Sequence, residues 1–185
     1  MIFRDIEDRD LILRAREGHV ESYNILVSRW EKKVYNYILR VVGNRDDALD
    51  LCQDTFLKAY RNIAKLSDIE RFPQWLFRIA HNETISMFRR AKPTVGDEYL
   101  EQSVDLASLE RTRLDGAGFG STELGLVVEQ ALERLSDDQR QVVLLKVYQG
   151  FKFDEIAEIT GCPPSTVKSR LYSAFDALRG VLAVA

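Results

Sequence analysis

The sequence contains few of the residues that build covalent or metal-based frameworks. Among its 185 residues are only two cysteines, Cys52 and Cys162, and two histidines, His19 and His81. Two cysteines this far apart form neither a disulfide framework nor a zinc quartet, and the histidines are equally isolated. We therefore expect two reduced cysteines that pack as small apolar side chains, and no metal or cofactor.

Long apolar runs are missing from the sequence as well. No stretch approaches the ~20 apolar residues that a membrane-spanning helix needs, and residues 1–10 are too charged for a signal peptide. Hydrophobic residues make up 45% and charged residues 30% of the chain, a balance typical of water-soluble domains. We therefore expect a cytoplasmic protein that does not insert into a membrane.

Motifs of the common enzyme classes are not found either. The sequence has no Gly-rich phosphate loop, no cluster of metal ligands, and no Ser or Cys within a nucleophile motif. We therefore expect a protein that is not an enzyme. The formal net charge of −3 at pH 7 provides little attraction to phosphates, so DNA binding would need help from a partner.

Apolar residues recur at helical spacing through most of the chain, and no long β-type alternation occurs. Pro73 suits the first turn of a helix, and Asp46 and Ser136 are placed to cap two others. In the helix that begins at Asp46, Leu49, Leu51 and Tyr60 are among the expected apolar positions. We expect an all-α protein with helices at about 11–16, 21–42, 46–63, 73–90, 124–135, 138–148, 153–160 and 165–181.

The helical pattern stops between Ala91 and Thr122. This stretch is acidic and contains Pro93 and several glycines, and so long a segment without regular structure is uncommon inside one domain. We therefore expect two small helical domains, residues 1–92 and 123–185, joined by a flexible acidic linker at 93–122. A weak helical pattern at 104–114 is compatible with a short helix in the linker.

Residues 153–172, which read FDEIAEITGCPPSTVKSRLY, have the pattern of a helix-turn-helix. Gly161 supplies the positive φ that the turn needs, and Val167 and Leu171 predict the buried face of the second helix. Small hydroxyls and two cations lie on the opposite face, which suits a helix that enters the DNA major groove. The residues expected to contact DNA are Ser165, Thr166, Lys168, Ser169, Arg170 and Tyr172.

The alternative for this helix is an ordinary solvated face. Taken one residue at a time, the hydroxyls and cations favour that alternative. The combination of a short helix, a glycine turn, Pro-x-Thr-Val and Lys-Ser-Arg-Leu is much rarer by chance, and it favours DNA binding.

Three segments resemble the extracytoplasmic-function (group 4) sigma factors of bacterial RNA polymerase. They are DDALDLCQDTFLKAY at 46–60, FPQWLFRIAHNETISMFRR at 72–90 and LSDDQRQVVLLKVYQGFKFDEIAEITGCPPSTVKSRL at 135–171, in family order and at family-like spacing. The resemblance covers nearly the whole chain except the linker. It implies a region 2 helical bundle, a region 4 helix-turn-helix, and a factor that directs promoter-specific initiation by core polymerase.

The resemblance assigns the 46–60 helix to polymerase binding. Its implied partner is a coiled coil in the largest polymerase subunit, the clamp helices. Asp50, Gln53 and Asp54 match the polar contact positions, and spacings of three and four place them on one helical face. An ordinary solvated acidic helix would show the same residues. The family commonly has Glu where this chain has Asp54.

The resemblance assigns the 72–90 helix and the loop before it to opening of the −10 promoter element, with a flipped non-template base captured in a pocket there. Extruding a base costs a few kcal/mol, which stacking and hydrogen bonds must offset. Asn82 matches a position that contacts a base or the backbone. Arg78, Arg89 and Arg90 could hold the phosphates of the strand.

Other residues of the 72–90 helix have less certain roles. Trp75 and Phe77 could stack on bases or pack in the core, and we favour core packing for Trp75. His81 is a lone imidazole for which a structural or solvated position is favoured over a functional one. The family usually has Asp where this chain has Ser86, which leaves the geometry of the DNA-facing side open.

The implied partners are core RNA polymerase, promoter DNA and an anti-sigma protein. The acidic linker is expected to run through the RNA exit path and the active-site cleft of the polymerase. One rival is a conventional helix-turn-helix regulator, which explains 153–172 but not 46–60. Another is a sigma paralogue without melting activity, for which Ser86 is the only indication.

Overall fold

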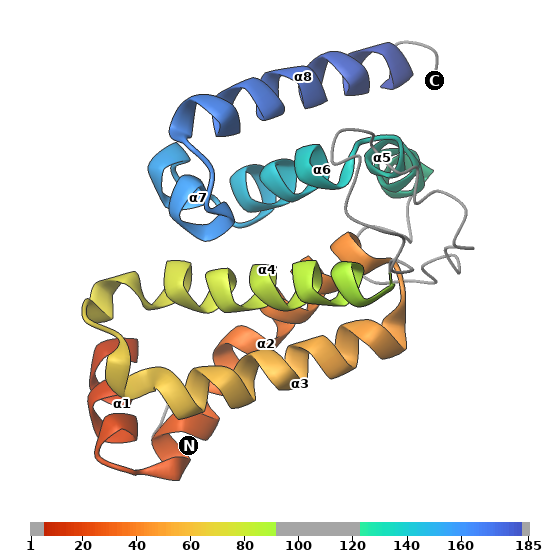
Figure 1. The fold of residues 1–185 in the computed structure, drawn as a ribbon. Helices are drawn as coiled ribbons and strands as arrows, with labels where there is room; N and C mark the ends of the chain where they lie inside the picture. The colour runs from red at the N-terminus through yellow and green to blue at the C-terminus, as the bar shows by residue number, and fades with distance from the viewer. Residues whose placement is uncertain (1–5, 92–122, 183–185) are drawn as a thin grey trace.

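The computed structural model describes residues 6–91 and 123–182, and every regular element within these ranges is helical. Figure 1 shows α1–α4 in one half of the molecule and α5–α8 in the other, with α4 along the boundary. The predicted all-α fold with two helical domains is confirmed. The expected linker at 93–122 lies outside the described residues. No helix of the described ranges is long and apolar enough to cross a bilayer.

The N-terminal domain contains four helices that agree with the predicted segments to within a few residues. Two short 3₁₀ turns, η1 and η2, connect the last two helices, where the sequence predicted only a polar connection. The elements are α1 (Asp8–Arg16), α2 (Val20–Val42), α3 (Arg45–Asn62), η1 (Ile63–Lys65), η2 (Ile69–Arg71) and α4 (Phe72–Ala91).

The turn between α2 and α3 differs in one detail from the prediction. Gly43 ends α2 in the left-handed conformation, with φ 74°. Asn44, not Asp46, caps α3, because the Asn44 side chain accepts hydrogen bonds from the backbone N–H groups of Asp46 and Asp47 at 2.9 and 3.1 Å. Asp46 instead lies in the first turn, where its charge favours the positive end of the helix dipole.

The core of the N-terminal domain forms where α2 packs between α1, α3 and α4. Val34, Tyr37 and Ile38 of α2 are almost completely buried, and each large buried side chain contributes roughly 1.5–3 kcal/mol of transfer free energy. Two of the apolar positions expected in α3 lie outside this core: Leu49 is 57% exposed and Tyr60 38% exposed. They line a surface groove instead.

The C-terminal domain contains the predicted helix-turn-helix behind two supporting helices. Ser136 and Gln139 form a reciprocal capping box at the start of α6, which confirms the predicted cap. The helix expected to continue to Tyr148 becomes a π-helical turn, η4, after Val143. The elements are α5 (Glu123–Glu133), α6 (Asp137–Val143), η4 (Leu144–Tyr148), α7 (Phe153–Thr160) and α8 (Pro164–Leu182).

The two domains pack directly against each other, which the sequence did not predict. We call this the interdomain interface: α2, η2 and α4 on one side, and α6, η4, α7 and Phe151 on the other. The Phe77 ring of α4 lies with its centroid 5.4 Å from that of Tyr37 and 5.2 Å from that of Phe151. As a result, the buried apolar residues of both domains join in one cluster.

Candidate polymerase and nucleic-acid interfaces

The acidic positions expected to bind polymerase lie on the outer surface of α3. Asp50, Gln53 and Asp54 are all exposed, as their shared helical face predicts. The opposite side of α3 is anchored by Ala48, which is fully buried, and by Thr55, whose hydroxyl donates to the Leu51 carbonyl at 2.7 Å. The carboxylates are therefore held on a rigid helix and face solvent.

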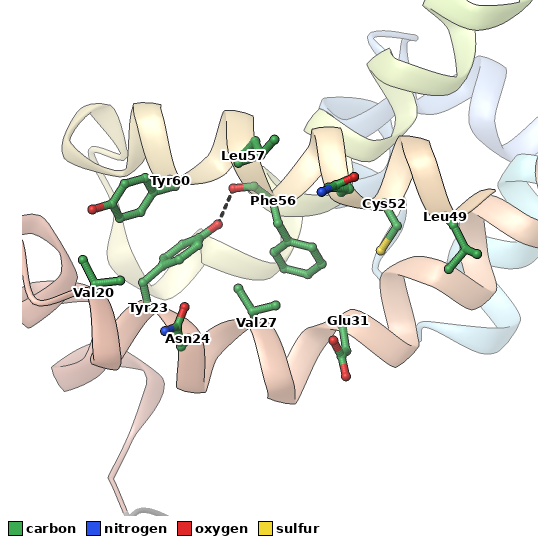
Figure 2. Close-up of a pocket in the computed structure, with 11 residues that line it drawn as sticks. Val20, Tyr23, Asn24, Val27, Glu31, Leu49, Cys52, Phe56, Leu57 and Tyr60 are labelled. Atoms are coloured by element: carbon green, nitrogen blue, oxygen red, sulfur yellow. Dashed lines mark hydrogen bonds between the residues drawn. The ribbon is translucent and has the colours of Figure 1, made fainter. Parts of the chain in front are cut away.

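An apolar groove lies beside these carboxylates, between α2 and α3 (Figure 2). Its volume is about 430 Å³, and Gln53 lies on its wall. The Tyr23 hydroxyl donates to the Phe56 carbonyl at 2.5 Å, and the Tyr23 and Tyr60 rings lie 4.9 Å apart, so one end of the groove is fixed. The sequence showed the apolar residues here but not their exposure. The exposed apolar residues of the groove are Val20, Leu49, Leu57 and Tyr60.

Cys52 lines the same groove without being a reactive thiol. Burial, with the nearby Glu31 carboxylate, raises the pKa of the Cys52 thiol to about 11. A thiol with this pKa is almost entirely protonated at neutral pH, and the thiolate is the nucleophilic form. This agrees with the expectation that Cys52 acts as a small apolar side chain.

The outer side of α4 presents the polar residues assigned to the −10 element. Arg78, Asn82 and Arg89 are exposed, at spacings that place them along one side of the helix, and the exposed Arg90 lies beside them. Ser86 lies between Asn82 and Arg90 in sequence and is partly buried. Four residues expected for DNA are thus brought onto one exposed helical surface.

Buried contacts hold α4 in place beneath this surface. Glu83 is 6% exposed, and its carboxylate accepts from the Lys58 ammonium of α3 at 2.5 Å. Phe77 is fully buried and therefore not available to stack on a base. Trp75 is partly buried against the core, with its ring 6.0 Å from that of Phe72, which agrees with the favoured core packing.

A small pocket lies at the start of α4, where the resemblance expects a captured base. Its volume is about 200 Å³. Arg16 of α1 supports the loop behind it by donating to the carbonyls of Ile63, at 3.2 Å, and Leu66. The lining comes from both domains: Leu66, Ser67, Asp68, Arg71, Gln74, Trp75 and Arg78, together with Glu158 of α7.

The helix-turn-helix has the predicted buried face. Val167, Leu171 and Ala174 of α8 are at most 3% exposed, and Gly161 adopts φ 70° at the turn. The residues expected to contact DNA divide into two groups. Ser165, Lys168, Ser169 and Tyr172 are exposed, whereas Thr166 and Arg170 are partly buried.

Arg170 is held by contacts within the chain. Its guanidinium forms an ion pair with the Asp138 carboxylate of α6 and donates to the Cys162 sulfur at 3.1 Å. The sequence placed Arg170 on the outward arc, but a long side chain at the edge of that arc can turn toward a neighbouring carboxylate. Arg170 is therefore not directed at solvent in this structure.

Two lysines flank the Phe153 ring at the start of α7. Lys146 lies 4.9 Å and Lys168 5.5 Å from the ring centroid, which is cation–π distance. Lys146 was not among the expected DNA contacts, because it lies in η4 and is distant in sequence from the recognition helix. Its place beside Lys168 extends the positive surface of the helix-turn-helix.

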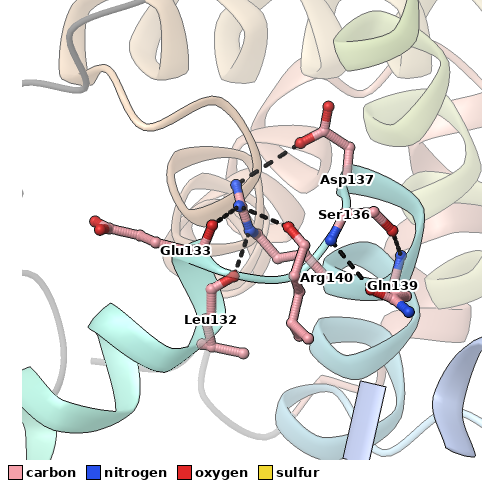
Figure 3. A network of polar contacts seen from close by, with 7 residues as sticks. Leu132, Glu133, Ser136, Asp137, Gln139 and Arg140 are labelled. Carbon is pink, nitrogen blue, oxygen red and sulfur yellow. Dashed lines mark hydrogen bonds and ion pairs between the residues drawn. The ribbon is translucent and has the colours of Figure 1, made fainter. Parts of the chain in front are cut away.

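The turn that supports the helix-turn-helix is built around Arg140 (Figure 3). Arg140 is 3% exposed, and its guanidinium donates to the carbonyls of Leu132, Glu133 and Leu135 at 3.0–3.2 Å. The Asp137 carboxylate lies 3.8 Å away. One planar cation therefore satisfies the carbonyl groups at the end of α5 and fixes α6, on which α8 packs.

His81 lies at the interdomain interface and is 8% exposed. Burial is the main cause that lowers the pKa of its imidazole. The neighbouring Gln141 side chain and the Asp138 carboxylate oppose this shift, and the Arg170 guanidinium reinforces it. His81 is therefore a buried neutral imidazole, which agrees with the favoured structural role.

Comparison with protein families gives two matches along the chain. Sigma-70 region 2 matches residues 26–94, and Sigma-70, region 4 matches residues 126–178. The ECF RNA polymerase sigma factor SigW of Bacillus subtilis is 32% identical over 176 residues, which are 91% of this chain and 92% of that protein. The RNA polymerase sigma-H factor of Pseudomonas aeruginosa is 28% identical, over 93% of this chain and 92% of its own length.

Solved structures share the fold across both domains. CnrH, in complex with the cytosolic domain of CnrY, superposes with a TM-score of 0.68 at 24% identity over 96% of this chain and 97% of that one. The sigma factor RpoE from Bartonella quintana, in complex with the anti-sigma factor NepR, gives 0.65 at 24% identity over 89% and 98%. At this identity the likeness concerns the fold alone.

Replacement of Arg140 should destabilise the C-terminal domain. We expect Arg140→Ala to lower the free energy of unfolding by about 2–4 kcal/mol, because buried carbonyls lose a charged donor. Arg140→Lys should restore only part of this, since an ammonium cannot reproduce the guanidinium fork. Chemical denaturation measures the change. Arg134→Ala, which removes an exposed arginine, is the control and should change the free energy of unfolding by less than ~0.5 kcal/mol. Equal stability of the two alanine variants would contradict the assigned role.

Protonation of His81 should reduce stability in acid. The folded protein lowers the pKa of His81 below the unfolded value of 6.5, so the unfolded chain binds the proton more tightly. The contribution of the neutral ring is therefore fully present above pH 6.5 and declines as the pH falls below it. Between pH 7 and pH 5, we expect the melting temperature of His81→Gln to fall less than that of the wild type. His19→Gln, which changes an exposed histidine, should show the wild-type dependence of melting temperature on pH. If His81→Gln shows that same dependence, the prediction is refuted.

Proposed function

The chain belongs to the extracytoplasmic-function class of sigma-70 factors, and from this premise we propose how its surfaces divide the work of promoter-specific transcription initiation. As a sigma factor it binds core RNA polymerase and directs it to promoters. The observation that carries the assignment is the 32% identity with SigW over 91% of the chain. We propose that residues 1–92 bind polymerase and melt the −10 element, that 93–122 connect the domains, and that 123–185 read the −35 element.

The surface proposed for polymerase is α3 together with the groove beside it. Asp50 and Asp54 supply negative charge for basic side chains of the clamp helices, and Gln53 supplies a neutral donor and acceptor. The exposed apolar side chains of the groove, including Leu49 and Leu57, give this polar surface an apolar centre. Interfaces commonly combine an apolar centre with polar groups around it, and the solvated-helix alternative provides no reason for exposed leucines here.

The surface proposed for the −10 element is the outer side of α4 with the pocket at its start. Arg78, Arg89 and Arg90 hold the phosphates of the unpaired strand, and Asn82 hydrogen-bonds to a base or to the backbone. The pocket of about 200 Å³ is of the size that one base requires. Trp75 on its wall offers an aromatic edge to that base, while its remaining surface packs on the core.

The surface proposed for the −35 element is the N-terminal half of α8. Ser165, Ser169 and Tyr172 are exposed and can approach base edges, and Lys168 can reach phosphates. Arg170 can join them once it leaves Asp138. A conventional helix-turn-helix regulator would use the same helix, but the region 2 match over 26–94 favours a sigma factor.

We further propose that an anti-sigma protein regulates this chain. The sigma factor RpoE of Bartonella quintana, which has the same fold, was solved in complex with the anti-sigma factor NepR. CnrH, also of this fold, was solved in complex with the cytosolic domain of CnrY. The proposed mechanism contains no chemical step carried out by this chain. The bonds of the transcript are made by the polymerase, and the factor contributes binding energy and strand separation.

Charge reversal on α3 should weaken binding to polymerase. We expect Asp50→Lys combined with Asp54→Lys to raise the Kd for core polymerase at least ~10-fold, because a close charge pair at an interface is worth upward of ~1.5 kcal/mol. Glu17→Lys, which reverses an exposed carboxylate outside α3, should bind like wild type. Fluorescence anisotropy with labelled chain and core polymerase measures this. If the folded double variant bound core polymerase with unchanged affinity, the assignment of α3 to polymerase binding would be wrong.

The two DNA surfaces should fail in different ways. Run-off transcription on genomic fragments identifies the promoters for this test. On these promoters, holoenzyme with Asn82→Ala should still bind the duplex. Thymines in the bubble should no longer react with permanganate, because the strands do not open. Arg170→Ala should reduce transcription from −35-dependent promoters, with discrimination lower by about 1–3 kcal/mol, and keep polymerase affinity. Normal opening by Asn82→Ala, or loss of polymerase by Arg170→Ala, would contradict the division.

Ser86 allows a test of the alternative that this chain is a sigma paralogue without melting activity. If the serine had removed melting, wild-type holoenzyme would bind promoters without permanganate-reactive thymines, and Ser86→Asp would restore them. We expect reactive thymines with the wild type. This outcome would exclude the rival directly.

A further inference from the structure

An ion pair joins the helix proposed for polymerase to the helix proposed for the −10 element. The Lys58 ammonium of α3 donates to the Glu83 carboxylate of α4 at 2.5 Å. The side chain of Glu83 is only 7% exposed, whereas that of Lys58 is 49% exposed. The two helices lie side by side in Figure 1 and pack along each other. Within the ranges that the structure describes, this is the one ion pair between α3 and α4.

The pair is located at the turn of α4 that carries Asn82. Asn82 is exposed and the next residue, Glu83, is buried, because consecutive residues of an α-helix point about 100° apart. On α3, Lys58 follows Asp54 by four residues, so it lies on the same face as a proposed polymerase contact. The ion pair thus connects the turn with Asn82 to the surface of α3 that polymerase is proposed to hold.

The other buried groups of the two helices carry no directional link between them. Ala59 of α3 and Ala80 of α4 are completely buried, and the buried Thr84 donates its hydroxyl to the His81 carbonyl of its own helix. Burial of apolar surface has no preferred direction, whereas a hydrogen bond depends on the angle at which its partners meet. The contact between Lys58 and Glu83 is therefore suited to select one rotation of α4 about its axis.

Stability alone does not account for a carboxylate at position 83. A half-exposed ion pair contributes little net free energy, and two apolar side chains in its place are often equally stable or more so. A buried carboxylate also costs free energy unless a partner holds it. What the pair adds over apolar packing is a defined direction, and it adds this one residue away from Asn82.

We propose that Lys58 and Glu83 are positioning residues for strand opening, which hold α4 in the rotation that directs Asn82 at the unpaired −10 strand. Neither side chain contacts DNA in this role, and both act through Asn82. The inference rests on the proposed function, because it takes Asn82 as a contact to the −10 element and α3 as the helix that polymerase holds. The ion pair then sets the place of Asn82 relative to the polymerase.

Small rotations of α4 matter because a hydrogen bond tolerates little displacement. An atom on the surface of a helix lies about 5–6 Å from the axis, so a rotation by about 20° moves it by roughly 2 Å. A hydrogen bond does not survive that displacement. An extruded base depends on such contacts, since unstacking it costs free energy. Loss of the pair should therefore reduce opening by the factor of ~2 to 10 that one hydrogen bond contributes.

Removal of both charges tests the pair without leaving a buried carboxylate unpaired. With core polymerase saturated by the variant, Lys58→Met with Glu83→Met should keep duplex binding by the holoenzyme. Thymine reactivity to permanganate in the bubble should decrease ~2- to 10-fold. Lys32→Met with Glu17→Met makes the same change at exposed positions outside α3 and α4 and should open promoters like the wild type. Wild-type opening by the variant of Lys58 and Glu83 would overturn the proposal.

A double-mutant cycle separates positioning from general stability. The readout is the Kd of the holoenzyme for a promoter whose −10 element is kept unpaired by mismatches, which gives a signal even where opening fails. Lys58→Met with Glu83→Met should raise this Kd ~2- to 10-fold in the wild-type background. In the Asn82→Ala background the same change should leave the Kd unaltered, because the pair acts only through Asn82. An equal loss in both backgrounds would assign the pair a merely structural role.

A reversed pair provides the rescue. Glu83→Lys alone brings two ammonium groups together and should reduce opening at least as much as the methionine variant. Adding Lys58→Glu should return opening to within ~2-fold of the wild type, because the attraction is restored. A reversed pair without rescue would count against the positioning role. Failure of the proposed function looks different: wild-type holoenzyme would open no promoter, or Asn82→Ala would open promoters normally, and the inference would fall with it.

Discussion

Phe77 lies between two aromatic rings of different domains. Through this contact α4 packs against both domains at once, and the rest of the structure depends on it. Tyr37 holds one side of the ring within the N-terminal domain, and Phe151 holds the other from the C-terminal domain. A helix packed on two sides has only a narrow exposed strip left. Arg78, Asn82 and Arg89 occupy that strip. The position of the second domain therefore decides how much of α4 can meet a nucleic acid.

Internal carboxylates engage several cations that a DNA-binding protein would direct outward. Arg71 and Arg170 each pair with an acidic side chain of the C-terminal domain, Glu158 and Asp138. These pairs leave fewer cations available for phosphates in a chain whose net charge is already −3. Under the proposed function, Arg170 must leave Asp138 before it can contact the −35 element. Reading by α8 would then include a competition within the chain as well as base contacts.

The helices and their buried faces could be predicted because they depend on local spacing. Val167 and Leu171 are buried as their periodicity required, and Gly161 has the positive φ that the turn demands. Local patterns do not reveal which apolar residues find a partner, so the spacing gave Leu49 and Tyr60 as apolar positions but not that they line a groove. The capping by Asn44 was missed because Asn and Asp two residues apart are equally suitable caps. The roles expected for Asp50, Asn82 and the other site residues remain predictions.

Contacts between distant segments could not be predicted at all. Arg71 and Glu158, or Phe77 and Phe151, are separated by most of a domain and by the linker, and no periodicity relates them. Arg170 looked like an outward side chain for the same reason, since Asp138 belongs to another helix. The sequence shows which residues could bind DNA, whereas their internal partners become visible only in three dimensions.

The buried polar atoms without partners at the interdomain interface, Gln141 Nε2 and Arg40 Nε among them, also bear on how firmly the two domains hold together. A single substitution that supplies a partner to either atom, or that replaces either group with an apolar one, would tighten the packing of the domains. A substitution that buries one more such atom would loosen it. Arg40 belongs to α2 and Gln141 to α6, so related chains could vary the strength of this packing without changing α3, α4 or α8, the helices proposed to bind polymerase and DNA.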